Sequence, residues 1–206
     1  MRLLPRFLVA LSIFFAAVAA AAPRTILVLG DSLSAGYGIG LEQSWPTLLE
    51  RRLEAGHIPY RVTNLSISGE TTAGGASRLP AALRQAHPAI VVIALGANDG
   101  LRGLPIEAMR ANLESMIRDS RDSGARVVLV GMRLPPNYGA AYGQRFSDTF
   151  ADLARQHGTP LVPFLLGGFA DRPEAFQADG LHPTAAYQAA VLDNVWPALA
   201  PLLKVR

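Results

Sequence analysis

Short runs of consecutive apolar residues recur along the chain and constrain its fold more than any other feature. Residues 25–29, Thr-Ile-Leu-Val-Leu, are typical of a strand buried on both faces, and similar runs cover 90–95 and 127–130, with weaker ones at 61–65 and 161–162. Each run is followed by a loop that carries glycine, asparagine or proline. Strands that lack a polar face belong to parallel sheets, which helices cover on both sides.

Helical patterns fill the intervals between these runs. From Pro105 to Gly124, apolar residues keep one face of a predicted helix that has proline at its start and glycine past its end. A second pattern precedes Gly158, and a third begins at Thr184 and is expected to kink or end at Pro197. The apolar residues of these stripes are Ile106, Met109, Leu113, Met116, Ile117, Phe146, Phe150, Leu153, Tyr187, Ala190, Val191 and Val195. Five strands that alternate with helices predict a three-layer α/β/α fold around a parallel sheet.

Residues 1–20 have the order of an export signal. A basic start is followed by an apolar run over 7–18 and then by alanines, the small residues that signal peptidases read. Because that run is short for a bilayer span of about 20 residues, the sequence predicts a signal peptide cleaved near Ala20 or Ala21. An uncleaved N-terminal anchor is the alternative. Residues 21–206 are then expected to form a single exported, periplasmic domain.

The positive charge of the chain belongs largely to that N-terminal segment. The sequence has 19 basic and 16 acidic residues, a formal charge of +3, and removal of Arg2 and Arg6 lowers this charge to +1. The remaining basic residues are dispersed, so no nucleic-acid partner is expected. The absence of cysteine excludes a thiol nucleophile, a thiolate metal site and a disulfide framework.

Four polar segments stand where a parallel sheet forms its sites. Three of them, 30–34, 68–71 and 96–100, follow the first three strands, and the fourth, 179–183, precedes the last helix. Loops that leave the carboxyl ends of parallel strands meet at one edge of the sheet, and ligands bind there. The chemistry of the chain is therefore expected in these segments.

His182 differs from the other histidines because Asp179 lies three residues before it. A carboxylate at that spacing can accept a hydrogen bond from Nδ1 and leave Nε2 facing a reactant. The alternative is that Asp179 only caps a turn or a helix, and the spacing does not decide between the two. Pro183 suits the first position of a helix, which would place the imidazole at a helix start. The other histidines have structural explanations in turns or at a helix end: His57, His87 and His157.

Ser32 is the best-placed nucleophile, because it follows a buried strand by two residues. The ordinary alternative is a turn or cap residue, and the Gly-x-Ser-x-Gly elbow of α/β-hydrolases is absent around Ser32. Acyl transfer also needs hydrogen-bond donors for a developing oxyanion. Gly69 offers a backbone amide and Asn98 a side-chain amide, although both residue types are also common in turns.

In order and spacing, the four polar segments resemble the sequence blocks of the GDSL or SGNH hydrolase family. The resemblance extends from Thr25 almost to the C-terminus, and motifs at 45–46, 100–103 and 133–139 are similar to those of its bacterial thioesterases, lysophospholipases and arylesterases. It implies a flavodoxin-like strand order 2-1-3-4-5. The catalytic residues that it implies are Ser32 as nucleophile, His182 as base and Asp179 as the partner that orients the base. The oxyanion donors that it implies are Ser32, Gly69 and Asn98.

The resemblance also implies hydrolysis of esters and thioesters through an acyl-enzyme. No cofactor is expected, and no metal is expected because the aspartates and histidines show no pattern suited to a closed ligand set. The expected partners are small acyl esters, thioesters or lysophospholipids, with at most transient membrane contact, and the expected state is a monomer. Acyl-CoA is cytosolic, so lysophospholipids or short to medium acyl esters are the expected substrates of an exported enzyme. The residues expected along the acyl chain, which could equally be core or loop packing, are Leu33, Leu101, Leu134, Pro135, Tyr138 and Leu181.

The sequence is also compatible with two other functions. Deacetylation of a carbohydrate is compatible with the same fold and the same residues. An open α/β sheet can also bind a phosphate or a flavin at its switch point, and residues 36–40 offer three glycines. Leu41, however, stands where a dinucleotide fingerprint needs a further glycine.

Overall fold

The structure, a computed structural model, describes residues 22–203. The predicted signal peptide, residues 1–20, lies outside the described residues and stays a prediction. Within the described part of the chain, no helix has both the length and the apolar character needed to cross a membrane.

Strands and helices alternate along the chain, as the apolar runs predict. The strands are β1 (Arg24–Gly30), β2 (Tyr60–Asn64), β3 (Ile90–Ala94), β4 (Arg126–Val130) and β5 (Leu161–Val162). The α-helices are α1 (Ser32–Ala35), α2 (Trp45–Ala55), α3 (Thr72–Ala86), α4 (Ala97–Leu101), α5 (Ile106–Asp122), α6 (Ala140–His157) and α7 (Gln188–Leu199). Short 3-10 segments are η1 (Leu41–Gln43), η2 (Pro136–Tyr138), η3 (Pro173–Ala175), η4 (Ala185–Tyr187) and η5 (Ala200–Leu202). The five predicted strands are confirmed, with ends within one residue of those expected.

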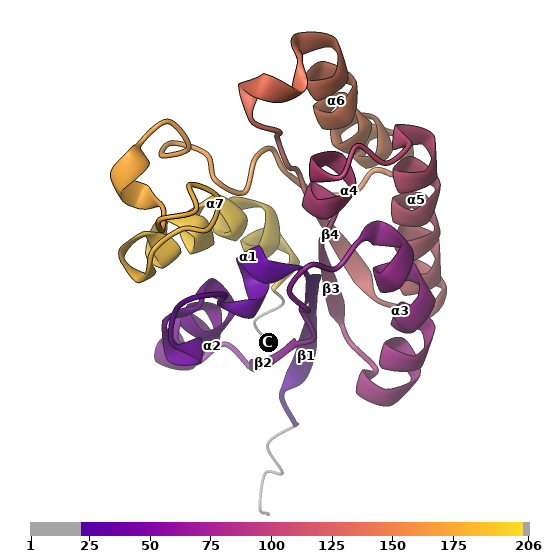
Figure 1. Ribbon diagram of the computed structural model, residues 1–206. Helices are drawn as coiled ribbons and strands as arrows, with labels where there is room; N and C mark the ends of the chain where they lie inside the picture. The colour runs from indigo at the N-terminus through magenta and orange to yellow at the C-terminus, as the bar shows by residue number, and fades with distance from the viewer. Residues whose placement is uncertain (1–21, 204–206) are drawn as a thin grey trace, which may run out of the picture.

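The strands form one parallel sheet in the order β2-β1-β3-β4-β5, which confirms the expected topology. Helices α2 and α7 cover one face of the sheet, and α3, α5 and α6 cover the other (Figure 1). This arrangement confirms the three-layer fold. Helices α2, α3, α5 and α6 return the chain for the next parallel strand, so they start on the side where the strands end, and α7 starts on that side after β5. We call that side of the sheet the carboxyl edge, and the opposite side the amino edge.

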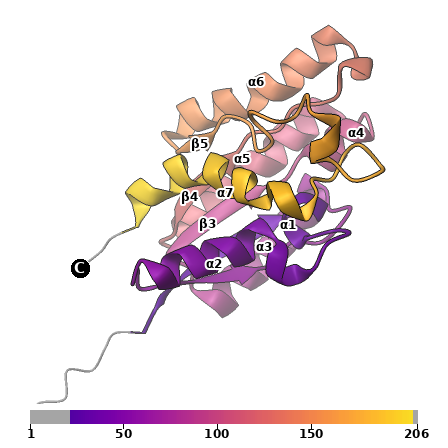
Figure 2. The same ribbon diagram turned by 90° about the vertical axis from the view of Figure 1, so that its left-hand side faces the viewer.

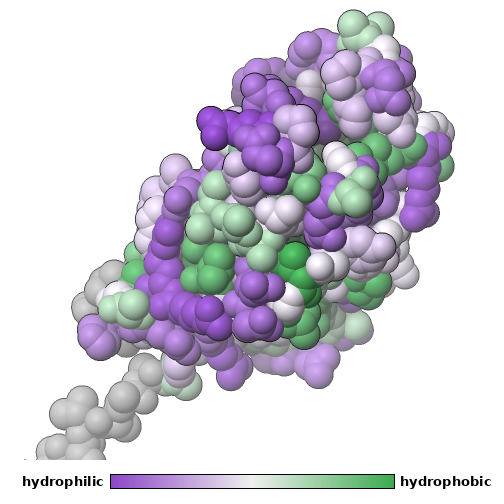
Figure 3. Space-filling view, turned by 60° about the vertical axis from the view of Figure 1, so that its left-hand side comes forward, coloured by the Kyte–Doolittle hydropathy of each residue, from purple (hydrophilic) through white to green (hydrophobic). Residues whose placement is uncertain are grey.

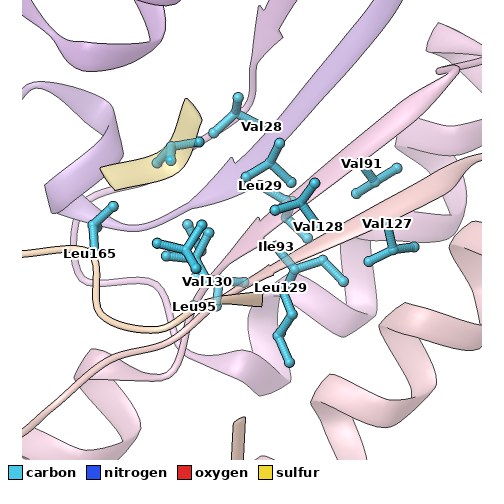
Figure 4. Close-up of a cluster of buried hydrophobic side chains, with 14 of the residues drawn as sticks. Val28, Leu29, Val91, Ile93, Leu95, Val127, Val128, Leu129, Val130 and Leu165 are labelled. Carbon is cyan, nitrogen blue, oxygen red and sulfur yellow. The ribbon is translucent and has the colours of Figure 1, made fainter. Parts of the chain in front are cut away.

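The central strands are apolar on both faces because the helices exclude water from each. The apolar residues of 26–29 and of 90–95 have no exposed surface, and their side chains pack with those of β4 in the middle of the molecule (Figure 4). The three largest fully buried side chains, Trp45, Phe146 and Phe150, come from the helices. Burial of one such side chain stabilises the folded state by about 1.5–3 kcal/mol, so this core is the main source of stability.

The last helix departs from the sequence prediction at both ends. Regular structure begins at Ala185, in η4, and not at Pro183, because Pro183 pairs with Phe176 in an isolated antiparallel bridge. Helix α7 then continues past Pro197 to Leu199, so of the two expectations for Pro197, a kink or an end, the end is wrong. A proline this close to the end of a helix removes one hydrogen bond of the last turn and leaves the earlier turns intact.

Helices α2 and α3 are additional elements that the apolar stripes do not reveal. Figure 2 shows α2 beside α7 on one face of the sheet. Helix α3 contains Gly74, Gly75 and Pro80, residues that lower helix propensity. Gly75 permits close packing, because a Cβ there would lie 2.3 Å from Cδ1 of Leu95. Contact with the sheet therefore outweighs propensity in α3.

The face formed by α2 and α7 carries a hollow of about 320 Å³ beside η4. Figure 3 shows this side of the molecule, with apolar surface gathered in the middle and hydrophilic side chains around it. The residues that line the hollow are Glu42, Gln43, Leu48, Arg51, Ala185 and Ala186. Such a mixture of apolar and charged groups is ordinary for a layer that faces solvent.

Candidate active site

Ser32 lies just past the carboxyl end of β1, at the first position of α1. The preceding residue, Asp31, caps this helix: its Oδ1 accepts a hydrogen bond from the N–H of Leu33 at 3.0 Å. Helix α1 lasts one turn and ends at Gly36, whose φ of 77° is left-handed. The sequence of strand, cap and short helix therefore holds Ser32 at the carboxyl edge.

His182 and Asp179 lie against Ser32, although the serine and the histidine are 150 residues apart in sequence. The Nε2 atom of His182 is 2.8 Å from Oγ of Ser32, and its Nδ1 atom is 2.7 Å from Oδ2 of Asp179. When Nδ1 carries the ring proton and donates it to the carboxylate, Nε2 can accept the hydrogen bond of the hydroxyl group. The three side chains thus form a continuous hydrogen-bonded series.

Asp179 both caps its loop and contacts the imidazole. Its Oδ1 accepts hydrogen bonds from the N–H groups of Leu181 at 2.9 Å and His182 at 3.0 Å, while Oδ2 faces the ring. The two interpretations of the Asp179 spacing are therefore compatible. Partial desolvation raises the pKa of Asp179, but these backbone hydrogen bonds and the imidazole outweigh it and lower the pKa to about 2. The carboxylate is ionised at neutral pH.

Tyr37 contacts the imidazole as well. The ring centroids of Tyr37 and His182 are 4.5 Å apart, with the planes tilted by 39°. Nε2 of Gln177 donates to the carbonyl groups of Tyr37 at 2.8 Å and Pro183 at 3.2 Å. Gln177 therefore ties the loop after α1 to the loop that carries His182. Neither Tyr37 nor Gln177 is predicted from the sequence, because a single polar or aromatic loop residue gives no signal of its partner.

Of the predicted oxyanion donors, Gly69 lies in the loop after β2, and Asn98 lies in the first turn of α4, the short helix that follows β3. Gly69 has a φ of 80°, a conformation that favours glycine, and its carbonyl accepts a hydrogen bond from Nη2 of Arg102 at 2.7 Å. Nδ2 of Asn98 donates to the carbonyl of Glu70 at 3.0 Å and to Oδ2 of Asp31 at 3.3 Å. These bonds join the loops after β1, β2 and β3 into one unit.

Asp31 is a buried carboxyl group beside the candidate nucleophile, with only 1% of its surface exposed. Burial raises the pKa of Asp31 to about 7; the hydrogen bonds from Leu33 and Asn98 oppose this rise, and the nearby Asp99 adds to it. Carboxyl groups with a pKa perturbed in this way gather at functional sites. No role of Asp31 is predicted from the sequence, since its only signal is its position next to Ser32.

Asp99, the neighbour of Asn98, is buried and fixes α4 to the adjacent helices. It accepts hydrogen bonds from the N–H of Thr72 at 2.9 Å and from the Oγ1 hydroxyl of Thr72 at 2.6 Å. Thr72 Oγ1 in turn accepts a hydrogen bond from Nδ2 of Asn112 at 3.1 Å. The first turn of α3 and the middle of α5 therefore hold the segment that carries Asn98, through contacts between residues far apart in sequence.

Four residues predicted for the acyl chain gather near α4. Leu134 packs against Gly100: a Cβ atom added to Gly100 would lie 2.6 Å from Cδ2 of Leu134. The hydroxyl of Tyr138 donates to the carbonyl of Leu101 at 2.9 Å, and Pro135 precedes η2 in the same segment. The structure thus brings these residues together, while their contact with a substrate stays a prediction.

The other two predicted residues lie next to the reacting groups in sequence. Leu33 follows Ser32 and packs partly against the core, whereas Leu181 precedes His182 and is 40% exposed. Leu33 therefore has a structural role in addition to the predicted one. The burial of Leu181 contributes little to the fold, because much of its side chain faces solvent.

The chain is similar to known proteins along most of its length. Residues 28–190 match the GDSL-like lipase/acylhydrolase family. The chain is 50% identical over 183 residues to esterase TesA of Pseudomonas aeruginosa, a match that covers 89% of this chain and 91% of the relative. It is 39% identical over 184 residues to thioesterase 1/protease 1/lysophospholipase L1 of Escherichia coli, with 89% and 87% covered.

A solved structure extends this similarity to three dimensions. The psychrotrophic esterase EstA from Pseudoalteromonas sp., inhibited by monoethylphosphonate, is 37% identical, with a TM-score of 0.83 over 87% of this chain and 98% of that one. The resemblance seen in the four polar segments is thereby confirmed. This chain belongs to the GDSL-like lipase/acylhydrolase family and is a hydrolase.

Proposed function

We propose that this chain hydrolyses carboxylic esters and thioesters of small acyl substrates, with Ser32 as the nucleophile. The observation that carries the proposal is the hydrogen-bonded series from Asp179 through His182 to Ser32, with distances of 2.7 and 2.8 Å. An ionised carboxylate orients the imidazole and stabilises the imidazolium that forms during catalysis. The names of the relatives, esterase and thioesterase/lysophospholipase, support the same class of reaction.

The reaction proceeds in two halves. Nε2 of His182 takes the hydroxyl proton while Oγ of Ser32 forms a bond to the acyl carbon. The bond from that carbon to the leaving oxygen or sulfur breaks, and the imidazolium returns the proton to the leaving group. Water, deprotonated by His182, then attacks the acyl-enzyme, which releases the acid and restores Ser32. Asp179 keeps its charge throughout.

The negative oxygen that develops on the acyl group would be stabilised by the amides of Ser32 and Gly69 and by Nδ2 of Asn98. Nδ2 has two N–H bonds, and their acceptors without substrate are the carbonyl of Glu70 and Oδ2 of Asp31. The bond to Asp31 is the longer, at 3.3 Å against 3.0 Å. We therefore propose that the oxyanion displaces Asp31 and leaves the bond to Glu70 in place.

We assign the physiological substrates to lysophospholipids or other short to medium acyl esters. The predicted export signal at residues 1–20 would take the enzyme to the periplasm as a monomer, away from cytosolic acyl-CoA. We expect thioesters to be cleaved when they are supplied to the enzyme in an assay. Peptide bonds are a much harder target for a serine enzyme, so we expect little proteolysis.

A substrate series tests this proposal. Initial rates are measured with p-nitrophenyl esters from acetate to laurate, with lysophosphatidylcholine and with an acetylated sugar. We expect turnover of the butyrate ester and the lysophospholipid. Cleavage of acetyl groups alone would contradict the proposal and indicate a carbohydrate deacetylase, and the absence of any turnover would point to a binding module.

The same assay tests the proposed independence of metal. Within residues 22–203, no group of three or more His, Cys, Asp or Glu side chains is arranged to hold a metal ion. We expect EDTA to leave the rate with p-nitrophenyl butyrate unchanged. Loss of activity with EDTA and its recovery with a divalent cation would contradict this part of the proposal.

A further inference from the structure

The large apolar side chains exposed in the described residues all lie in connections from a strand to the next covering helix. They are Tyr37, Leu41, Ile67, Leu104 and Leu181, with exposed fractions between 38 and 69%. Tyr37 and Leu41 lie between β1 and α2, Ile67 between β2 and α3, Leu104 between β3 and α5, and Leu181 between β5 and α7. Because all these connections cross the carboxyl edge, the side chains share that edge with Ser32. We call this set the apolar rim.

Members of the apolar rim lie against or beside the proposed catalytic groups. The ring of Tyr37 contacts the imidazole of His182, and Leu181 is the next residue in sequence. Ile67 is fixed near the end of β1, since its N–H donates to the carbonyl of Gly30 at 3.0 Å. Exposed apolar side chains that gather around a site indicate an interaction surface, whereas scattered ones need no explanation.

Charge favours an electrically neutral partner. The charged side chains exposed beside the rim have both signs: Glu42 is next to Leu41, Arg102 is two residues before Leu104, and the connection that carries Leu181 has both Arg172 and Glu174. Asp179 in that connection is ionised at neutral pH, because its pKa is about 2. Binding to anionic headgroups depends on clusters of basic residues, and these interspersed charges form no such cluster. A zwitterionic surface offers apolar contact and needs no net charge on the protein.

We infer that the apolar rim docks the enzyme on a zwitterionic phospholipid surface, so that an acyl ester passes from the lipid to Ser32 without crossing water. This inference rests on the proposed function for the identity of the substrate. A folded protein seated on the rim would cover the groups around Ser32, whereas a fluid lipid surface supplies substrate to them. Partial insertion of side chains such as Leu41 and Ile67 gains the free energy of burial without a new fold.

The test measures binding to phosphatidylcholine vesicles by cosedimentation, in a Ser32→Ala background that leaves the lipid intact. Every variant is purified in the form that the cell exports, so the N-terminal segment is the same in each. Leu41→Ser with Ile67→Ser removes two exposed members of the rim. We expect this pair to weaken binding about tenfold or more. Leu203 is a half-buried leucine near the amino edge, and the matched control is Leu203→Ser, which should bind like the parent.

Activity measurements with Ser32 intact separate this inference from the proposed function. We expect the rim variant to hydrolyse dissolved p-nitrophenyl butyrate at the parent rate and aggregated lysophosphatidylcholine about tenfold more slowly. Failure of the parent to hydrolyse the butyrate ester contradicts the proposed function and leaves the vesicle result standing on its own.

Three outcomes would overturn the inference. The first is a parent protein that does not bind phosphatidylcholine vesicles. The second is equal loss of binding in the rim variant and in the Leu203 control. The third is binding that requires anionic phosphatidylglycerol and disappears in high salt, which would assign docking to arginines and not to apolar side chains.

Discussion

The two edges of the sheet are built from different kinds of residue. At the amino edge, the last turns of the long helices carry basic side chains, which complement the negative ends of the helix dipoles: Arg52, Arg84, Arg121, Arg155 and His157. Arg121 also donates to the carbonyl of His157 and to Oγ1 of Thr159. Hydrogen bonds and charges at this edge stabilise the ends of helices.

The carboxyl edge holds groups that are costly to the folded state. Asp31 is buried there with a pKa of about 7, and large apolar side chains face solvent. Burial of an ionisable group costs stability, and an exposed apolar side chain contributes little to it, so such groups indicate a functional use. Stability and chemistry are therefore separated in this molecule along the direction of its strands. Substitutions of the polar groups around Ser32 should therefore affect activity, and those at the amino edge should affect only stability.

The largest expected effect is that of Asp179→Asn at the carboxyl edge. Loss of the carboxylate removes the partner that fixes the imidazole tautomer, so we expect kcat/KM for p-nitrophenyl butyrate to fall about 10³- to 10⁴-fold. The matched control is Asp122→Asn at the end of α5, an exposed carboxylate that should leave kcat/KM unchanged. A fall of less than tenfold in the first variant would remove Asp179 from the mechanism.

Asp31→Asn should change the pH dependence of stability. The folded pKa of Asp31, about 7, is raised above the ordinary value of 3.8, so its protonation stabilises the folded state. This contribution is complete below about pH 4 and is lost as the pH rises through about 7. Relative to the wild type, the free energy of unfolding of the variant should therefore rise between pH 4 and 8, by up to about 4 kcal/mol. Parallel curves from urea unfolding at each pH would contradict the burial of an ionisable Asp31.

Asn98→Ala, at the carboxyl edge, should reduce catalysis and leave the fold intact. Loss of one oxyanion donor costs about 3 kcal/mol in the barrier, so we expect kcat to fall about 10²- to 10³-fold with little change in KM. The circular dichroism spectrum should match that of the wild type. Gln156→Ala, an exposed amide in the last turn of α6, serves as the control and should keep full kcat. A variant with raised KM and normal kcat would indicate that Asn98 only binds substrate.

The smallest expected effect lies at the amino edge, where His87 ends α3 with a φ of 42°. Glycine adopts this left-handed conformation without strain, so His87→Gly should raise the free energy of unfolding by about 0.5–1 kcal/mol. Activity with p-nitrophenyl butyrate should not change. A loss of activity would show that the two edges are coupled.

The sequence predicts the sheet well because its strands are apolar on both faces. Runs such as 25–29 and 90–95 can be explained only by burial, and the loops after them locate the carboxyl edge. Helix α3 is not predicted from the sequence, because Gly75 has low helix propensity and instead permits close contact with Leu95. The start of α7 is misplaced because the bridge between Pro183 and Phe176 joins residues whose sequences give no sign of pairing.

The candidate site is predictable in its residues and not in its supports. Ser32, His182 and Asp179 are each marked by position or spacing, and the structure brings them within hydrogen-bond distance. The contacts that hold Asn98 come from residues 28 and 67 positions away in sequence, Glu70 and Asp31. Only the fold creates such neighbours, so the raised pKa of Asp31 has no counterpart in the sequence pattern.

Covalent labelling tests whether Ser32 is the activated nucleophile of the carboxyl edge. A fluorophosphonate probe is allowed to react with the folded protein, and the modified residue is mapped by peptide mass spectrometry. We predict one adduct, on Ser32, which is lost in Ser32→Ala and formed much more slowly in His182→Ala. An adduct on another residue, or labelling that persists in Ser32→Ala, would contradict the account.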